Sequence, residues 1–244
     1  MAIRVLVNGA FGRMGQYVTK AVTAHPHLEL EGQTGREYDL AQAIKDSKAD
    51  VVVDFTLPDA VFKNAQTIIQ SGARPVIGTT GLKTDEIKLL QKACATSRLG
   101  GIIAPNFSLG GVLVMKYARE IAKYMPNMEI IEKHHELKVD SPSGTAIRAA
   151  EMLAESVEQA NPGIKPSIDT IPGSRGAMLH GIPIHAIRLP GMLAHLEIIF
   201  GNPGETVSLR HDTLDRQCFM PGVCLACEKV MGLDRLVYGL EEML

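Results

Sequence analysis

The chain has 244 residues, of which 45% are hydrophobic and 21% charged, a balance typical of a globular protein with one or two domains. A net charge of -2 and the lack of tryptophan argue against a nucleic-acid surface, which needs a basic patch and aromatic stacking platforms. No apolar run approaches the roughly 18 residues of a membrane span, and the short apolar N-terminal run leads directly into a glycine motif, so we expect a cytoplasmic protein without a signal peptide.

The N-terminal stretch IRVLVNGAFGRMGQYV predicts a strand, a glycine turn and a helix. Ile3 to Val7 is a short β-branched run, as in a buried parallel strand, and Gly9, Gly12 and Gly15 follow in a GxxGxxG pattern. Glycines here permit a tight turn and close approach of the backbone to a pyrophosphate, which faces the free N–H groups of the helix start. The spacing differs from the common GxGxxG form, so a plain strand-to-helix turn is the alternative.

A second strand, LELEGQTG, should end near Gly35, where many NAD-binding folds place an acid that holds the ribose hydroxyls. Here Arg36 and Glu37 follow instead. The guanidinium of Arg36 could pair with the 2′-phosphate of NADP, whereas Glu37 could still serve NAD. The remaining alternative is that Arg36 is a solvated loop residue.

Strands then alternate with helices, which indicates a parallel sheet with right-handed crossovers. In such sheets ligands lie outside the carboxyl ends of the strands, so the turns after Phe55, Ile77 and Ala104 are candidate cofactor contacts. The predicted elements are a strand from Val51 to Phe55, a helix from Ala60 to Ser71, a strand from Pro75 to Ile77 and a strand ending near Asn106.

The pattern changes beyond Asn106, where we place a domain boundary. A helix from 108 to 124 and a strand from 128 to 132 lead into three β-rich runs before residue 213, with a hairpin turn at Asn202–Glu205. After Asp215 the chain returns to helix, which we expect to pack on the first domain. The sequence thus predicts one domain from residues 1–106 and 216–244 and a second from residues 107–215.

The segment IIEKHHELKVDSPSGTA, residues 130–146, carries a concentration of proton-handling groups. His134 and Lys138 converge if the chain bends between them, and Ser143 is a candidate N-cap for a helix that starts near Thr145. The free N–H groups of Gly144 and Thr145, with the nearby hydroxyls and the lysine charge, form a small anion site. The segment therefore suits a small carboxylate-bearing substrate with a proton donor beside it; a polar surface loop is the plainer alternative.

A metal site is the weaker interpretation of this segment. Adjacent histidines point in different directions in most backbones, no HExxH pattern is present, and Lys138 would repel a cation. Cys224 and Cys227 form a lone CxxC without a second pair or a nearby histidine, and at helical spacing they favour a buried apolar face over zinc. We therefore predict no metal centre.

Five stretches of the chain resemble the 4-hydroxy-tetrahydrodipicolinate reductase (dihydrodipicolinate reductase) family: NGAFGRMG, VDFTLPDA, IGTTG, APNFSLGG and, above all, EKHHELKVDSPSGTA. The section from Arg175 to Gly222 also matches, so the resemblance covers nearly the whole chain. It implies a Rossmann-like parallel-sheet domain, a second α+β domain with a mixed, largely open sheet, and NADPH- or NADH-dependent reduction of 4-hydroxy-tetrahydrodipicolinate, a cyclic dicarboxylate, to tetrahydrodipicolinate in lysine and diaminopimelate biosynthesis.

The resemblance also implies roles for individual residues. His134 and Lys138 would transfer protons, while His135, Gly144 and Thr145, with the cap residue Ser143, would bind substrate. The resemblance implies that the cofactor is lined by Gly9, Ala10, Phe11, Gly12, Arg13, Met14, Gly78, Thr79, Thr80, Ala104, Pro105, Asn106 and Phe107. The residues at the end of the second strand add Gly35 and Arg36 to this set.

Members of this family are usually homotetramers joined through the sheets of the second domain. The chain departs from longer members after Arg36, where the connection to the third strand is short, and Gly35 replaces an acid that some members use on the ribose. Two alternatives differ in class or substrate: an NAD(P)H-sensing module, which would need the glycine turn but not His134 and Lys138, and a related amino-acid dehydrogenase.

Overall fold

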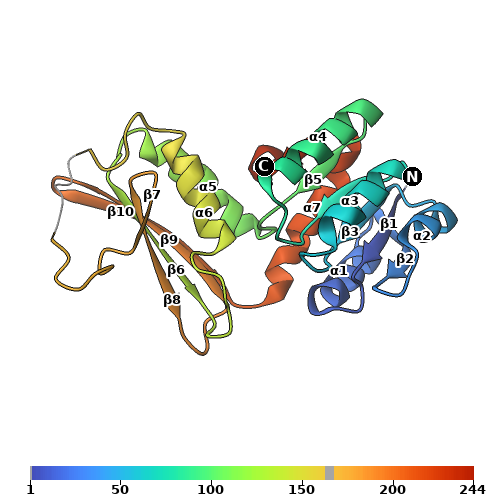
Figure 1. Cartoon of the computed structure of the whole chain (residues 1–244), viewed down its shortest axis with the longest axis horizontal. Coiled ribbons are helices and arrows are strands. Elements are labelled where there is room, and N and C mark those ends of the chain that lie inside the picture. The colour runs from blue at the N-terminus through green and yellow to red at the C-terminus, as the bar shows by residue number, and fades with distance from the viewer. Residues whose placement is uncertain (1, 163–167) are drawn as a thin grey trace. The chain divides into compact units, whose positions relative to one another are not determined.

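The computed structural model describes residues 2–162 and 168–244 and divides the chain into two compact units (Figure 1). Unit 1 consists of Met1–Leu109 and Arg216–Leu244, and unit 2 of Gly110–Asp215. Within the described ranges, no helix is long and apolar enough to cross a membrane.

Unit 1 is built on a six-stranded sheet in the order β11-β5-β4-β3-β1-β2, in which all paired strands are parallel. The central strands are short and apolar and are buried on both faces, as expected when helices cover a parallel sheet. This confirms the Rossmann-like class. The strands are β1 (Ile3–Asn8), β2 (Leu28–Thr34), β3 (Val51–Asp54), β4 (Arg74–Ile77), β5 (Gly101–Ile103) and β11 (Leu236–Tyr238).

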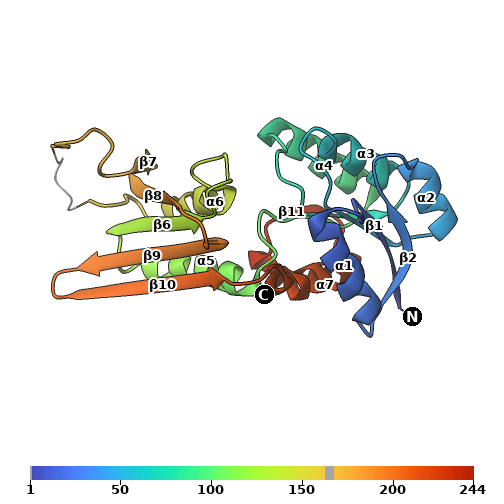
Figure 2. The ribbon, with the colours of Figure 1, turned by 90° about the horizontal axis from the view of Figure 1, so that it is seen from below.

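Helices pack on both faces of this sheet (Figure 2). One layer pairs α1 with α7, and the other joins α2, α3 and α4, under which lies a core that includes Leu6, Val52 and Ile68. Helix α2 was not predicted, although Asp39 caps it by accepting a hydrogen bond from the backbone N–H of Gln42 (3.1 Å). The helices are α1 (Arg13–Ala24), α2 (Leu40–Ser47), α3 (Val61–Gln70), α4 (Thr84–Ser97) and α7 (Met220–Lys229).

Unit 2 contains a mixed five-stranded open sheet in the order β10-β9-β6-β8-β7. Strands β6 and β8 are parallel, whereas the other pairs are antiparallel, so the α+β prediction is confirmed. The predicted hairpin joins β9 to β10 through Pro203 and Gly204, whose φ of +87° favours glycine. The strands are β6 (Met128–His134), β7 (Ala177–Leu179), β8 (Ile182–Arg188), β9 (Ala194–Asn202) and β10 (Glu205–Thr213).

Helices α5 (Leu109–Ala122) and α6 (Gly144–Ala154) lie on one face of this sheet (Figures 1 and 2). The burial along β6 alternates, with Met128, Ile130 and Glu132 buried and the intervening residues partly exposed. Because side chains on a strand alternate between faces, Glu132 belongs to the row otherwise occupied by apolar core residues. A carboxylate in that row requires a structural explanation.

Candidate active site

A cleft of about 910 Å³ lies in unit 1 at the carboxyl ends of β1 to β4, within the size range of cofactor pockets. Most of the predicted cofactor residues line it. They are Gly9, Phe11, Gly12, Arg13, Met14, Gly35, Arg36, Gly78, Thr79 and Thr80. The turn after Phe55, predicted from its place at a strand end, also lines the cleft, with Thr56, Leu57, Pro58, Asp59 and Ala60. Lining residues that were not predicted are Asn8, Tyr38, Leu40, Phe55 and Asn64.

The other predicted cofactor residues do not line this cleft. Ala10 is buried with 2% exposure, and the turn Ala104–Phe107 follows β5, the strand beyond β4. Phe107 lies 5.7 Å, centroid to centroid, from the ring of Phe55, which does line the cleft. Phe107 therefore supports a wall of the cleft from behind.

The three glycines of the motif have different structural roles. Gly9 has a φ of +81°, and a Cβ there would lie 2.3 Å from the carbonyl oxygen of Phe55. A Cβ on Gly15 would lie 2.0 Å from the carbonyl oxygen of Gly9, so only glycine lets α1 start so close to the turn. Gly12 is the N-cap of α1, and a Cβ there would lie 3.3 Å from the carbonyl oxygen of Gly9, so this position is less crowded than the other two. The result is a helix N-terminus presented to the cleft at close range, a geometry that fits a dinucleotide phosphate.

A buried polar network fixes the floor of the cleft. Asp54, at the end of β3, is completely buried and accepts hydrogen bonds from Asn8 (2.8 Å), Asn64 (3.0 Å) and the Thr79 hydroxyl (2.6 Å). Asn8 in turn accepts a hydrogen bond from the Thr34 hydroxyl (2.9 Å). The network therefore ties together the ends of β1, β2, β3 and β4, and it holds the cleft in shape by satisfied buried polar groups.

Arg36 follows β2 at the edge of the cleft and is exposed. It makes no hydrogen bond or ion pair with any other residue in the described part of the chain. A Cβ on Gly35 would lie 3.0 Å from the Phe11 ring, and that ring stacks obliquely against Tyr38 at 5.9 Å. The guanidinium is thus available to an anion at this edge.

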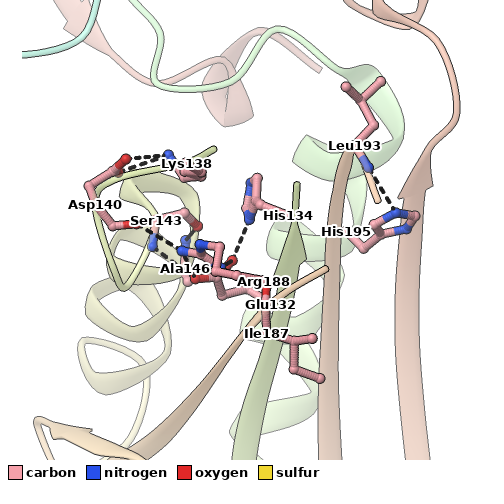
Figure 3. A network of polar contacts seen from close by, with 10 residues as sticks. All are labelled: Glu132, His134, Lys138, Asp140, Ser143, Ala146, Ile187, Arg188, Leu193 and His195. Atoms are coloured by element: carbon pink, nitrogen blue, oxygen red, sulfur yellow. Dashed lines mark hydrogen bonds and ion pairs between the residues drawn. The ribbon is translucent and has the colours of Figure 1, made fainter. Parts of the chain in front are cut away.

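The second cluster lies in unit 2, where β6 ends (Figure 3). His134 is the last residue of β6, and its Nδ1 forms a hydrogen bond with Oε2 of Glu132 two residues earlier. The guanidinium of Arg188, at the end of β8, donates to both oxygens of Glu132, at 2.8 and 3.0 Å. Since parallel pairing aligns His134 with Arg188, the sheet itself brings these groups together.

Glu132 is a carboxylate held in a fully buried position. Burial alone would raise the pKa of Glu132, but the hydrogen bonds from His134 and Arg188 outweigh it and lower that pKa. Because a carboxylate is only an acceptor, Nδ1 of His134 must carry the hydrogen in this pair. The other ring nitrogen, Nε2, is not engaged by Glu132.

Lys138 lies in the turn after β6, where its backbone N–H donates to the carbonyl of His135 (3.2 Å). Its ammonium group donates to both carboxylate oxygens of Asp140, at 2.7 and 2.8 Å. The pKa of Asp140 is lowered, because the Lys138 charge and hydrogen bond overcome the opposing effect of desolvation. Figure 3 shows Lys138 and His134 beside the start of α6.

The predicted N-cap at the start of α6 is confirmed. The Ser143 hydroxyl accepts a hydrogen bond from the N–H of Ala146 (3.3 Å), and the N–H of Ser143 donates to Oε1 of Glu132 (3.3 Å). Space is open beside Gly144, and Thr145 is partly exposed. Their two N–H groups make no hydrogen bond with another described residue, so the helix start offers free donors to an anion.

The sequence-predicted residues His134, Lys138, Ser143, Gly144 and Thr145 therefore lie on one strand end, one turn and one helix start. His135 adjoins them, half-buried and without a side-chain partner among the described residues. Sequence reasoning missed Glu132, Asp140 and Arg188. Glu132 and Arg188 are 56 residues apart, and only the strand register could have paired them.

The cysteines lie outside both sites. Cys224 and Cys227 are free and buried on α7, as predicted, and burial raises the pKa of Cys224 to about 11 and that of Cys227 further. A cluster that the sequence did not suggest, His25, His27 and Glu228, brings three possible metal-ligand atoms within 4.8 Å. His27 and Glu228 already form a partly exposed pair at 2.8 Å.

Comparisons with known proteins agree with this geometry. Family models described as dihydrodipicolinate reductase, N-terminus, and dihydrodipicolinate reductase, C-terminus, match residues 3–107 and 110–244. Proteins named 4-hydroxy-tetrahydrodipicolinate reductase from Coxiella burnetii (strain Dugway 5J108-111) and Legionella pneumophila (strain Paris) are 55% and 49% identical over 100% of both chains. A solved structure, dipicolinate-bound dihydrodipicolinate reductase from Paenisporosarcina sp. TG-14, is 39% identical with a TM-score of 0.88 over 100% of both chains.

Proposed function

The chain belongs to the dihydrodipicolinate reductase family, and from that premise we propose that it reduces 4-hydroxy-tetrahydrodipicolinate to tetrahydrodipicolinate in lysine and diaminopimelate biosynthesis. It is an oxidoreductase that uses NADPH or NADH. We assign cofactor binding to unit 1 and substrate binding to unit 2.

The cofactor assignment is supported by the cleft of unit 1. The nicotinamide cofactor supplies a hydride when bound. Gly9, Gly12 and Gly15 bring the backbone and the start of α1 to the pyrophosphate, and the Asp54 network keeps the four strand ends fixed beneath it. Arg36, at the edge of the cleft, can pair with the 2′-phosphate of NADPH. We therefore propose that the enzyme uses both cofactors and prefers NADPH.

The substrate assignment is supported by the start of α6. The N–H groups of Gly144 and Thr145 and the Thr145 hydroxyl bind one carboxylate of the cyclic dicarboxylate, and His135 contacts the same substrate. Lys138 can exchange Asp140 for a substrate carboxylate, because its ion pair is partly exposed and involves two side chains of one turn. The ring is thereby oriented toward the end of β6.

Proton transfer follows from the chemistry of the ring. The 4-hydroxyl group of the substrate leaves as water, which gives a conjugated imine. Addition of hydride to a carbon of this imine moves electron density to the far end of the conjugated system, where a carbon or nitrogen takes a proton. His134 donates that proton from Nε2, since Nδ1–H is engaged by Glu132. Lys138 is the second proton-transfer group and stabilises developing negative charge.

The observation that carries this proposal is the convergence of an oriented histidine, a lysine and a free helix N-terminus at the end of one strand. The test is steady-state NADPH oxidation with freshly generated 4-hydroxy-tetrahydrodipicolinate, repeated with NADH. Saturable consumption of the cofactor that depends on substrate is expected. Folded protein that binds NADPH but turns over none of this substrate would instead support a sensing module or a dehydrogenase of another substrate.

We also propose a homotetramer assembled through the sheets of unit 2. The open sheet leaves β10 and β7 as edge strands, and helices cover one face while the other retains partly exposed residues such as Ile199 and Glu197. Light scattering coupled to size-exclusion chromatography measures the mass directly; a monomer of 26.4 kDa at working concentration would contradict the proposal.

A further inference from the structure

We infer that Glu132 is a positioning residue for the proton-transfer histidine, and that the Glu132–Arg188 pair is the fixed point to which the three parts of the substrate site are attached. The inference rests on the proposed function, in which His134 transfers the proton. Neither residue needs to touch the substrate for this role.

The contacts of Glu132 carry the inference. Its side chain is completely buried, yet each of its oxygens accepts two hydrogen bonds. Oε1 accepts from Nη2 of Arg188 (2.8 Å) and from the N–H of Ser143 (3.3 Å), and Oε2 accepts from Nη1 of Arg188 (3.0 Å) and from Nδ1 of His134. A carboxylate with this many donors keeps its charge despite burial, because Arg188 supplies a bidentate positive partner.

Those donors come from three different segments. His134 belongs to β6, Arg188 to β8 and Ser143 to the start of α6, and Nη2 of Arg188 also donates to the carbonyl of Asp140 (2.8 Å) in the turn that carries Lys138. One buried ion pair thus sets the proton donor, the lysine turn and the anion-binding helix start in a fixed relation. An apolar residue at 132 could fill the same row of the core, but it could not make these links.

The second consequence concerns the histidine ring. A negatively charged acceptor at Nδ1 selects the tautomer that carries its hydrogen on Nδ1, which leaves Nε2 to take up and release a proton. The same acceptor stabilises the imidazolium that must exist before the proton is given away. Among the described residues, the titratable or charged groups around this ring are Glu132 on β6, Arg188 on β8, the Lys138–Asp140 pair in the turn, and His195 on β9, which pairs with Asp212. Of these, Glu132 is the one in direct contact with Nδ1.

The decisive variant is Glu132→Gln, which preserves shape but places an NH₂ group against donors. We expect kcat to fall about 10- to 100-fold, the loss found when the carboxylate behind a metal-bound histidine is removed. We also expect the upper limb of the pH profile of kcat/KM to move to lower pH, because the imidazolium loses its anion. NADPH affinity, which depends on unit 1, should not change.

Glu129→Gln is the matched control. Glu129 lies on the same strand and pairs with His185 at 2.7 Å and with Arg175, so the variant removes a histidine–carboxylate pair that lies outside the proposed site. It should leave kcat and the pH profile as in the wild type. Equal effects of the two variants would reduce Glu132 to a general structural role and overturn the inference.

A readout independent of turnover is the tautomer of His134, measured by long-range ¹H–¹⁵N NMR of the imidazole and assigned with the variant His134→Gln. We expect Nδ1–H in the wild type and loss of that preference in Glu132→Gln. An Nε2–H tautomer in the wild type would refute the inference even if the enzyme is active. Correct tautomers in protein that fails to turn over the substrate would instead refute the proposed function.

Arg188→Lys tests the anchoring role of the Glu132–Arg188 pair separately, and it can replace Glu132→Gln if that variant does not fold. A lysine is a point charge that cannot donate to both oxygens and to the Asp140 carbonyl in the same geometry. We expect a lower kcat together with a raised KM for substrate, because the lysine turn and the start of α6 lose their common anchor. A wild-type kcat and KM in a folded Arg188→Lys protein would exclude the anchoring role.

Discussion

Replacing Gly15 by alanine should destabilise unit 1 and weaken cofactor binding together. The added Cβ would lie 2.0 Å from the carbonyl oxygen of Gly9 and 2.7 Å from the Cα of Ala10. Ordinary contact begins near 3.4 Å, so about 1.4 Å of separation must be gained. All of these atoms belong to the backbone, so no side-chain rotation relieves the clash, and α1 must move away from the turn that it follows.

The magnitude follows from overpacking, which costs roughly 1–3 kcal/mol in well-packed interiors. Because the atoms that the new Cβ would meet are all backbone atoms, we place Gly15→Ala at the upper end of this range, about 3 kcal/mol. That loss of stability lowers Tm by roughly 6–12 °C in a chain of this length. Because the moved element is the helix start that we propose as the pyrophosphate site, the Kd for NADPH should also rise. Differential scanning fluorimetry with and without NADPH, and a fluorescence titration, measure both effects.

Gly232→Ala is the control, since unit 1 leaves open space beside Gly232 and its φ is not positive. This variant should change Tm by no more than about 2 °C, corresponding to roughly 0.5 kcal/mol. If Gly15→Ala matches the control in both Tm and Kd, the close approach of α1 to the glycine turn does not determine the site.

His134→Ala should keep NADPH affinity but lower kcat by about 10²–10⁴-fold, the usual contribution of a general acid; an unchanged kcat, or loss of NADPH binding, would contradict its assignment. Thr145→Val should raise KM for the substrate and leave the Kd of the cofactor unchanged, and a dicarboxylate inhibitor found elsewhere in a crystal structure would rule out the helix-start site. Arg36→Ala should weaken NADPH roughly tenfold and NADH much less; equal losses in kcat/KM would mean that Arg36 does not read the 2′-phosphate. The hydrogen bond from Arg4 lowers the pKa of Asp50, so the stability from this pair is present above the ordinary aspartate pKa of about 4 and is lost as pH falls through the lower folded value. Asp50→Asn should therefore lower Tm at about pH 6 more than at about pH 3, and an equal loss at both would argue against the linkage.

Elements whose signal is local were predictable from the sequence. The run at Val51–Asp54 and the glycine turn carry their own patterns, as does the N-cap at Ser143, and each is found in the structure. Small errors have local causes too. The fifth strand ends at Ile103 and not near Asn106, two residues before Pro105, which has no N–H to offer a ladder. Strand β6 runs two residues beyond its predicted end, to His134, because β8 and β9 continue to pair with it.

The candidate site divides along the same line. His134, Lys138 and the helix start are neighbours in sequence, so their residue types and spacing indicated proton transfer beside an anion site. The role of Glu132 could not be inferred in this way, because alternation along a strand predicts an apolar residue wherever a row faces the core. Its partner Arg188 lies on a strand whose register with β6 is a tertiary property. What the sequence lacks, then, is the pairing that makes a buried charge tolerable.

The division of unit 1 into two stretches of chain has a consequence for biosynthesis. An edge strand of its sheet is β11 (Leu236–Tyr238), which pairs with β5. Leu236 of this strand belongs to the core of unit 1. Unit 2, by contrast, is one continuous stretch that ends at Asp215. A nascent chain on the ribosome therefore carries every residue of unit 2 before α7 and β11 have been translated, and domains generally fold as units during synthesis. The edge of β5 therefore stays unpaired until β11 has been translated, and an unpaired strand edge of this kind is prone to aggregation in the interval.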